Sequence, residues 1–483
     1  MLATQEPSTD LFDVVIIGAG AAGITLALHL GQAGVQTALV EGGDYELSTA
    51  SQDLYQGFNQ GIDYSLTGMR LRFFGGTTNH WSGWCRPLDP ATFDPRDTID
   101  YPGWAIDKAD LDPYLDDAQN ILDVQPALPW EPNDSQKQPD FHPYLEQASF
   151  KEVYWKWSPP TRLKAKYLET LQADPNITIS VGDSLVDFEF TDEGEITGAI
   201  LRNIHNGSFR TVRGKLFVLA CGAIENARLL LHINAINAVD FGNQSGQLGK
   251  NFMEHPHFYN AGQVVIFDQS YDQSVPVQSK GYRFFIPTND FVKTNQILRS
   301  SIRFRMLEKA KDRQIFIREL AAISHLEPQT HWQVANIDVA SEQIPSAINT
   351  VTLSDETDRL NIHKAILHWE LEDIDYESVR KMLLHFAEFI IDTDLGRCKL
   401  EPWITNPNVK KLPLGGGHQM GTTRMADNEA DGVVDTDCKL FGTKNLYIAG
   451  SSVFTTGGYT NPTLTIVQLA LRLAQHLQGR LQT

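Results

Sequence analysis

The sequence predicts an α/β protein with two parts: a Rossmann-like domain assembled from separated segments of the chain, and an α+β domain with a mostly antiparallel sheet. Three observations support this prediction. A strand–turn–helix–strand unit opens the chain, a strand that feeds a helix recurs near 216–232 and near 445–477, and residues between 260 and 401 alternate in polarity. At 483 residues the chain is also too long for one ordinary hydrophobic core.

The opening unit predicts a parallel sheet. Residues 13–17 (DVVII) form a short β-branched run, the turn GAGAAG follows, and a stretch of helix formers ends at Gly34. A second strand at 35–40 ends at Glu41. A strand, a crossover helix and a second strand of this size make a βαβ unit, whose strands are parallel.

The turn of this unit carries a dinucleotide fingerprint. Gly18, Gly20 and Gly23 occupy its three glycine positions, and Ala22 lies among them. Glycine at these positions permits the tight turn, the close approach of a pyrophosphate and the packing of helix on strand. The helix N-terminus favours the negative phosphates, and Glu41 is placed to accept hydrogen bonds from an adenosine ribose. This fingerprint does not separate NAD from FAD.

The remaining elements follow from composition and period. Residues 88–143 are rich in Pro, Asp and Trp, which is typical of ordered loops and short helices. Strand-like runs return at 177–181, 185–190 and 216–220, and the last precedes a helical stretch at 224–232. Alternation at 351–353 and 365–371 predicts a sheet with one covered face. A final helix is expected at 461–477, where Asn-Pro starts it.

One amphipathic helix interrupts the alternating region and presents an apolar stripe. The stripe consists of Val379, Met382, Leu383, Phe386 and Ile390.

We therefore expect a cofactor domain and a substrate domain that interleave along the chain. The cofactor domain takes residues 1–87, 171–259 and 412–483. Residues 88–170 form a loop-rich cover with a segment of the substrate domain, and 260–411 form the substrate domain itself.

Several motifs in order resemble the glucose-methanol-choline (GMC) oxidoreductases, a family that binds FAD. The motifs are GGTTNHWSGWCR (75–86), VLACGAIENARLLL (218–231), LGKNFMEHP (248–256), HQMGTTRM (418–425) and GYTNPTLTIVQLALRLA (458–474). They span nearly the whole chain. The resemblance implies FAD as the cofactor and oxidation of an alcohol as the activity.

The resemblance places the catalytic pair at His418 and Asn461. Hydride leaves an alkoxide more readily than a neutral alcohol, so a base must accept the hydroxyl proton. Histidine suits this role because its ordinary pKa of roughly 6.5 lies near working pH. The Asn461 amide is suited to donate to the oxygen as negative charge develops there. Without the resemblance, His418 reads as a loop histidine and Asn461 as a helix cap before Pro462.

Further residues are expected at the flavin. The small side chains of the 75–80 motif and the ends of later strands allow the backbone to approach the cofactor closely. Asn79 is a candidate donor to a flavin edge, and the role of Ser451 is open because many relatives carry an acidic residue near this position. The expected contacts are Gly75, Gly76, Thr78, Asn79, His80, Ala220, Gly450, Ser451 and Thr463.

His80 has two alternative roles. The spacing of GGTTNHW is similar to that of pyranose oxidases, in which this histidine is bonded to the flavin 8-methyl carbon. The alternative is a histidine that packs over the dimethylbenzene ring without a bond. The sequence leaves both open.

Other conspicuous residues have structural explanations. His255 and His257 lack a third ligand at a recognisable spacing, so no metal site is predicted. Trp155 and Trp157 suit either sugar stacking or core packing. The four cysteines form no C-x-x-C pair, and Cys85 and Cys221 read as small residues beside the cofactor.

The expected activity is oxidation of a secondary alcohol of a sugar or glycoside to a ketone by base-assisted hydride transfer to flavin N5. The alternatives are a non-sugar alcohol oxidised in the same way, a flavin-binding lyase without net redox change, and an NAD-dependent enzyme, which leaves the C-terminal motifs unexplained. The electron acceptor, whether oxygen, a quinone or a redox protein, and the oligomeric state are not fixed by the sequence.

Charge and hydropathy limit the partners. Forty Lys and Arg against sixty Asp and Glu give a net charge of −20, which repels nucleic acid. No stretch approaches the roughly 18 apolar residues of a membrane span. Residues 1–10 lack the basic start and apolar core of a signal peptide, so we expect a cytoplasmic protein.

Overall fold

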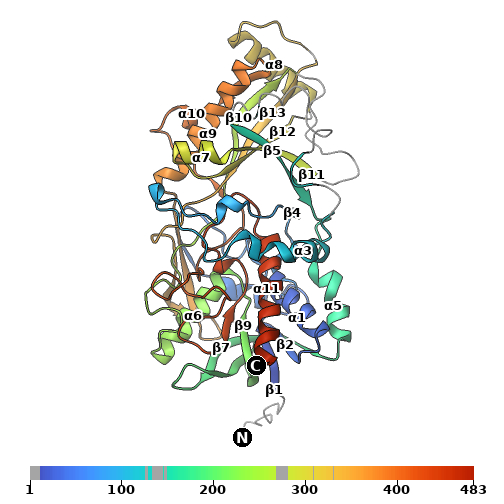
Figure 1. The fold of residues 1–483 in the computed structure, drawn as a ribbon, viewed down its shortest axis with the longest axis vertical. Coiled ribbons are helices and arrows are strands. Elements are labelled where there is room, and N and C mark those ends of the chain that lie inside the picture. Colours follow the sequence, from blue (N-terminus) through green and yellow to red (C-terminus); the bar gives the residue numbers. More distant parts are fainter. Residues whose placement is uncertain are drawn as a thin grey trace.

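The computed structural model describes residues 11–125, 129–132, 145, 149–267, 281–307, 309–329 and 331–482. Residues 1–10, on which the expectation of a cytoplasmic protein rests, lie outside this set. Figure 1 shows an elongated molecule with two parts, one above the other. The lower part is built on a largely parallel sheet and the upper part on an antiparallel sheet, which confirms the predicted fold class.

A parallel core forms the centre of the lower sheet. β1 (Leu11–Ile17) pairs in parallel with β2 (Thr37–Glu41) on one side and with β9 (Phe209–Leu219) on the other. β6 (Ile177–Val181) extends the sheet beyond β2, and β18 (Leu446–Ile448) pairs with the end of β9. The strands therefore come from three separated segments of the chain. β2, β18 and the carboxyl-terminal halves of β1 and β9 are buried because helices cover the sheet, whereas β6 at its edge is only partly buried.

β9 begins earlier than the predicted strand at 216–220. Its first residues pair antiparallel with β8 (Ile196–Asn203), which in turn pairs with β7 (Asp183–Phe190). β9 alternates exposed and buried residues as far as Lys215, whereas its last four residues, which pair with β1, are all buried. The apolar run thus predicted only the part of the strand that lies in the core.

Four helices accompany the lower sheet. The first and last helices of the chain pack on each other, as Figure 1 also shows. Their contact brings the C-terminal segment beside the opening βαβ unit. The helices are α1 (Ala21–Gln32), α5 (Leu163–Ala173), α6 (Ala223–Asn237) and α11 (Thr463–Gln482).

The upper sheet is antiparallel throughout. Its order is β16-β10-β13-β12-β11-β5-β4, with β17 beside β10. The strands are β4 (Trp84–Cys85), β5 (Phe150–Trp157), β10 (Pro256–Ile266), β11 (Gly281–Pro287), β12 (Ser300–Met306), β13 (Gln333–Ser341), β16 (Gly396–Leu400) and β17 (Leu414–Gly415).

Helix α9 (Asp373–Asp392) packs on this sheet with the predicted apolar stripe. All five stripe residues are fully buried in a core shared with β10, β12 and β13. Shorter helices complete the upper part: α7 (Asn289–Asn295), α8 (Ala310–Ile323) and α10 (Pro402–Thr405).

The predicted strands near 351 and 365 belong to a separate small sheet. β14 (Thr350–Thr357) pairs antiparallel with β15 (His363–Trp369), and β15 pairs in parallel with β3 (Phe58–Gly61). Both β14 and β15 contact α6 of the lower part. A period of two predicts a strand with one covered face but does not reveal which sheet the strand joins.

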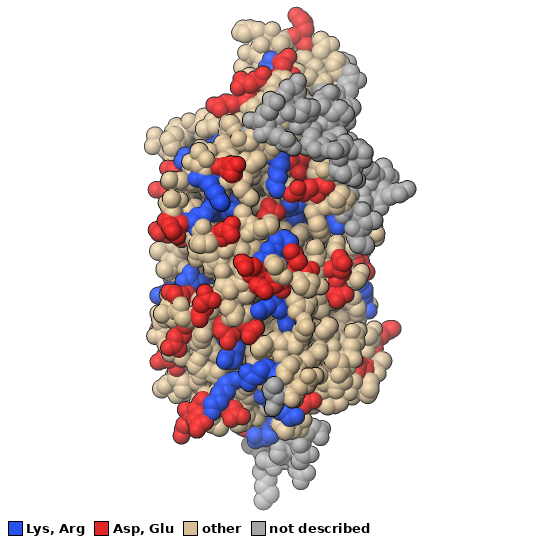
Figure 2. All heavy atoms as spheres, in the orientation of Figure 1, with Lys and Arg blue, Asp and Glu red and all other residues tan. Residues whose placement is uncertain are grey.

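Short helices and loops make up most of the remaining described residues. Among all the described residues, no helix is long and apolar enough to cross a membrane. Figure 2 shows acidic and basic side chains interleaved over one face. The short helices are α2 (Thr49–Gln52), η1 (Asp53–Tyr55), η2 (Gly76–Asn79), η3 (Pro90–Thr92), η4 (Asp97–Ile99), η5 (Lys108–Asp110), η6 (Asp112–Tyr114), α3 (Leu115–Ile121) and η7 (Ser451–Val453).

Candidate active site

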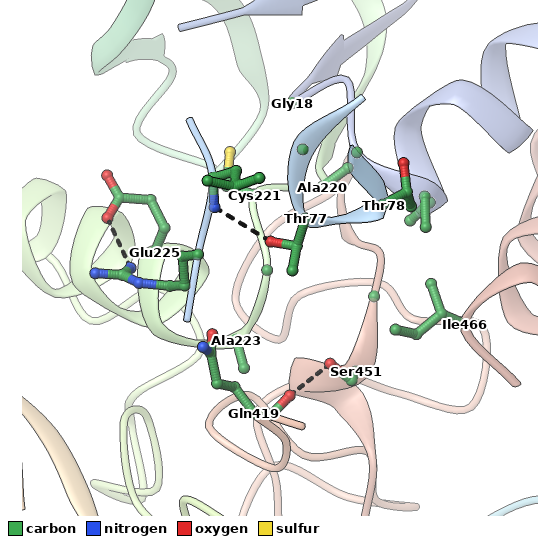
Figure 3. Close-up of a pocket in the computed structure, with 18 of the residues that line it drawn as sticks. Gly18, Thr77, Thr78, Ala220, Cys221, Ala223, Glu225, Gln419, Ser451 and Ile466 are labelled. Carbon is green, nitrogen blue, oxygen red and sulfur yellow. Dashed lines mark hydrogen bonds and ion pairs between the residues drawn. The ribbon is translucent and has the colours of Figure 1, made fainter. Parts of the chain in front are cut away.

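A cavity of about 430 Å³ lies at the carboxyl ends of the parallel strands (Figure 3). Its wall includes Gly18 after β1, Glu41 at the end of β2, Ala220 after β9 and Gly450 after β18. Open parallel sheets bind ligands at this edge because the loops that leave the strands diverge there. The volume lies in the range of ligand and cofactor sites.

Glycines wall the cavity from three separated segments. A Cβ built on Gly20, Gly222 or Gly450 meets no protein atom within 4 Å, so each position borders open space. Gly18 and Gly23 are different, because a Cβ on Gly18 falls 2.6 Å from the Ala220 carbonyl oxygen and a Cβ on Gly23 falls 1.8 Å from the Gly18 oxygen. The first group leaves room for a ligand, and the second permits the turn and its close packing.

Glu41 is fixed at the nucleotide end of the cavity. Its two carboxylate oxygens accept hydrogen bonds from the Ala19 N–H at 2.9 Å and the Gly43 N–H at 2.8 Å. Each carboxylate oxygen keeps a further lone pair for a ribose hydroxyl. Ala22 also lines the cavity near the N-terminus of α1, whose dipole favours phosphate. The residues present fit a dinucleotide.

The 75–80 segment approaches the cavity from another side. Gly76, Thr78 and His80 line the cavity, whereas Gly75 and Asn79 do not. Asn79 donates from its amide to the carbonyls of Phe74 and Gly76 at 3.0 Å each, so it holds the turn itself.

His418 and Asn461 meet at the other end of the cavity, and both line it. The Asn461 Nδ2 lies 3.0 Å from the His418 Nε2. On the opposite side of the ring, His418 Nδ1 lies 2.9 Å from His255 Nδ1. Burial, together with His255 and His257, holds the pKa of His418 well below its usual value. The imidazole is therefore neutral and carries a lone pair at working pH.

Glu254 holds the loop that carries His418. Its carboxylate accepts from the Gly416 N–H at 2.9 Å and from the Tyr64 hydroxyl at 2.6 Å. The Tyr64 oxygen in turn accepts from the Gln419 amide at 3.0 Å. Burial raises the pKa of Glu254 to about 7. The loop is thereby held on both sides of His418.

Two more predicted residues line the cavity, and one of them contacts the loop of His418. The Ser451 hydroxyl donates to the Gln419 carbonyl at 2.6 Å, as Figure 3 shows. This contact gives Ser451 a role without an acidic group. Thr463 lines the cavity where α11 begins.

Aromatic side chains lie in the cavity wall and against Asn461. Trp81 and Trp84 line the cavity, and the ring of Trp84 lies 4.7 Å from that of Tyr282. Trp155 lies behind this surface, with its ring 4.1 Å from Phe284. Its indole N–H donates to Asn461 Oδ1 at 3.1 Å.

The sequence did not predict the roles of several of these residues in the site. Glu254 and His255 lie inside the LGKNFMEHP motif, which was a signal for the family but not for their contacts. Trp81 and Trp84 follow His80 in the 75–86 motif.

The remaining conspicuous residues form no second centre. Within the described residues, no group of three or more His, Cys, Asp or Glu side chains is placed to hold a metal ion. Burial raises the pKa of the Cys85 and Cys221 thiols, and of these two residues only Cys221 lines the cavity.

Comparisons with known proteins agree with this geometry. A family model described as FAD dependent oxidoreductase matches residues 13–290, and one described as GMC oxidoreductase matches residues 345–470. A 2-methyl-1,2-propanediol dehydrogenase of Mycolicibacterium austroafricanum is 24% identical over 98% of this chain and 96% of its own. A C-glycoside 3-oxidase of Microbacterium trichothecenolyticum is 24% identical over 63% of this chain and 55% of its own.

A solved structure shares the fold at full length. Pyridoxine 4-oxidase from Mesorbium loti superposes with a TM-score of 0.63 at 16% identity, over 97% of this chain and 99% of its own. The predicted family is thus confirmed by two matches: the FAD dependent oxidoreductase model covers more than half of the chain, and the GMC oxidoreductase model covers its C-terminal part. The chain belongs to the GMC oxidoreductases and is an FAD-dependent enzyme.

Proposed function

We propose that the protein oxidises a secondary alcohol of a sugar or glycoside to a ketone. The observation that carries the proposal is the neutral His418 imidazole, whose Nε2 lies 3.0 Å from the Asn461 amide at the edge of the cavity. A base and a hydrogen-bond donor in direct contact suit a hydroxyl oxygen that replaces this contact and binds both groups.

The chemistry follows from these two groups. The hydroxyl donates its proton to His418 Nε2, and Asn461 Nδ2 donates a hydrogen bond to the oxygen as negative charge develops. The C–H electron pair leaves with the hydrogen as hydride, so the carbon becomes a carbonyl carbon. When bound, FAD supplies the acceptor for that hydride. The dipole at the N-terminus of α11 favours negative charge near Thr463.

A sugar is favoured by the aromatic wall and by one relative. Trp81 and Trp84 line the same cavity as His418 and Asn461, and a pyranose offers C–H bonds to such rings. The C-glycoside 3-oxidase relative acts on a glycoside by its name. A non-sugar alcohol is the second candidate, because the relative that matches 98% of the chain is a propanediol dehydrogenase.

His80 is the candidate for covalent attachment of the cofactor. It lines the cavity, and burial together with Arg162 lowers the pKa of its imidazole, which keeps a nucleophilic lone pair. Acid precipitation separates the two alternatives. A yellow pellet supports a bond through His80, and a colourless pellet with a yellow supernatant supports packing without a bond.

A substrate screen tests the function. Glycosides and simple alcohols are supplied with an artificial electron acceptor, and in parallel with oxygen as the acceptor. We expect turnover with a glycoside and bleaching of the yellow spectrum by the same compound under argon. Turnover only with simple alcohols would favour the second candidate, and product without bleaching would contradict oxidation altogether.

A further inference from the structure

A chain of hydrogen bonds runs through the catalytic pair. Each of its ends is a group that can only accept or can only donate a hydrogen bond. At one end His255 Nε2 lies 2.9 Å from the Gly458 carbonyl oxygen and 3.3 Å from that of Gly457. Carbonyl oxygens only accept hydrogen bonds, so His255 Nε2 carries the hydrogen.

The proton position on His255 determines the one on His418. Burial lowers the pKa of His255 to about 4, so its ring is neutral and its Nδ1 keeps a lone pair. The two Nδ1 atoms lie 2.9 Å apart, and a hydrogen bond between them requires that one of them carries a hydrogen. Because His255 Nδ1 is the acceptor, His418 Nδ1 is the donor. The lone pair of His418 therefore lies on Nε2, which faces Asn461.

The opposite end of this chain of hydrogen bonds gives the same answer independently. An indole N–H only donates, so the atom of Asn461 that lies 3.1 Å from Trp155 Nε1 is the amide oxygen. The amide nitrogen then faces His418 Nε2 at 3.0 Å and donates to its lone pair. With the other tautomer of His418, two donors would oppose each other across this contact.

We propose that His255 and Trp155 are positioning residues, which hold His418 as the Nδ1–H tautomer and the Asn461 amide with its nitrogen toward the base. This inference rests on the proposed function, because it assigns the lone pair to the nitrogen that accepts the hydroxyl proton. Neither residue lines the cavity, so neither is placed to contact the substrate.

The upper sheet supplies both positioning residues. Trp155 lies in β5, and its ring packs 4.1 Å from Phe284 of β11 and 5.6 Å from Tyr459. His255 is 1% exposed and directly precedes β10. The upper part thus sets the proton arrangement of a pair that lies on the loop after β17 and just before α11.

The chain offers a matched control in a second histidine pair. His232 Nδ1 lies 2.9 Å from His363 Nδ1, and burial lowers the pKa of His232 to about 4. Neither residue lines the cavity. His232→Phe thus removes one ring of an equivalent contact away from the catalytic pair.

The direct test is the tautomer of His418, read by two-dimensional ¹H–¹⁵N NMR on ring-labelled holoenzyme. The His418 signal is assigned by its loss in His418→Gln. We expect hydrogen on Nδ1 in the wild type, in His255→Asn and in His232→Phe, since the Asn Oδ1 replaces the acceptor at Nδ1 of His255. In His255→Phe, where Trp155 still holds the Asn461 amide nitrogen toward Nε2, we expect the Nε2–H form to appear beside the Nδ1–H form, because the Nδ1–H group has lost its acceptor. Hydrogen on Nε2 in the wild type, or an unchanged tautomer in His255→Phe, overturns the role of His255.

Reaction rates give the second readout. We expect His255→Phe to slow flavin reduction about tenfold, since a share of the base is then in the wrong tautomer, and His255→Asn to recover most of the loss. Trp155→Phe keeps the ring but removes the N–H, and we expect a decrease of about tenfold in rate. A wild-type rate in Trp155→Phe overturns its role.

The outcomes separate this inference from the function on which it rests. If no alcohol reduces the enzyme, the proposed function fails, while the NMR measurement still decides the tautomer. If an alcohol is oxidised and the tautomer does not respond to His255→Phe, only the positioning role fails. If His255→Phe does not fold, the wild-type spectrum and Trp155→Phe still decide both halves.

Discussion

At its nucleotide end the cavity is walled mainly by backbone, whereas at its catalytic end it is walled by side chains. The nucleotide end presents glycines, the N-terminus of α1 and a Glu41 carboxylate held by two backbone N–H groups. The catalytic end presents His418 and Asn461, which depend on His255 and Trp155 for their arrangement. Substitutions at the two ends should therefore have different effects. Added side-chain volume should weaken cofactor binding at the nucleotide end, and loss of one functional group should slow the reaction at the catalytic end.

The largest effect is expected at the catalytic end. His418→Ala removes the base, and we expect flavin reduction by substrate to slow by about 1,000-fold. The content of bound FAD should be unchanged, because the nucleotide end is intact. Anaerobic stopped-flow spectroscopy measures the rate and the visible spectrum measures the flavin. A near wild-type rate would refute His418 as the base.

Asn461→Ala should have a smaller effect. It removes the donor to the developing alkoxide but leaves the base, so we expect a decrease of about 100-fold in the same rate. Asn461→Asp serves as the matched variant, because it keeps the shape and removes the N–H donor. Equal rates in Asn461→Ala and the wild type would contradict the role of the amide.

The glycines sharpen the comparison at the nucleotide end. A Cβ on Gly20 enters open space beside the cavity, so Gly20→Ala should weaken FAD binding at least about tenfold without altering the stability of the FAD-free protein. Gly18→Ala should lower both the affinity for FAD and the stability of the FAD-free protein, because its Cβ meets the Ala220 oxygen and its φ is +107°. FAD titration and thermal unfolding measure the two properties. Unchanged binding in Gly20→Ala would show that this wall does not face the cofactor.

The smallest effect concerns pH. The folded protein keeps the Glu254 proton up to a pKa of about 7, whereas the unfolded chain releases it near 4.5. The folded state thus binds more protons between these values, and its stability falls as pH rises through this window. Glu254→Gln does not titrate, so the Tm of the wild type should fall by a few degrees relative to the variant between pH 4.5 and 7. A constant difference in Tm would exclude this titration.

The sequence predicts the nucleotide end of the cavity better than the catalytic end, and the reason is physical. The unit from 13 to 41 is local, because strand, turn and helix contact their neighbours in the chain, and composition and period predict all of it. The contacts of Asn461 with Trp155 and of His418 with His255 span 306 and 163 residues. They depend on how the two sheets are placed against each other, and no local pattern encodes that placement. The residues of the catalytic pair were predictable only through the resemblance to a family.

The central claim is that one hydroxyl oxygen binds between the base and the amide. A crystal structure with FAD and an unreactive analogue of a substrate identified by the screen tests it directly. We predict one ligand oxygen within about 3 Å of both His418 Nε2 and Asn461 Nδ2. A bound analogue with no atom in reach of both groups would contradict the mechanism and leave only the nucleotide site.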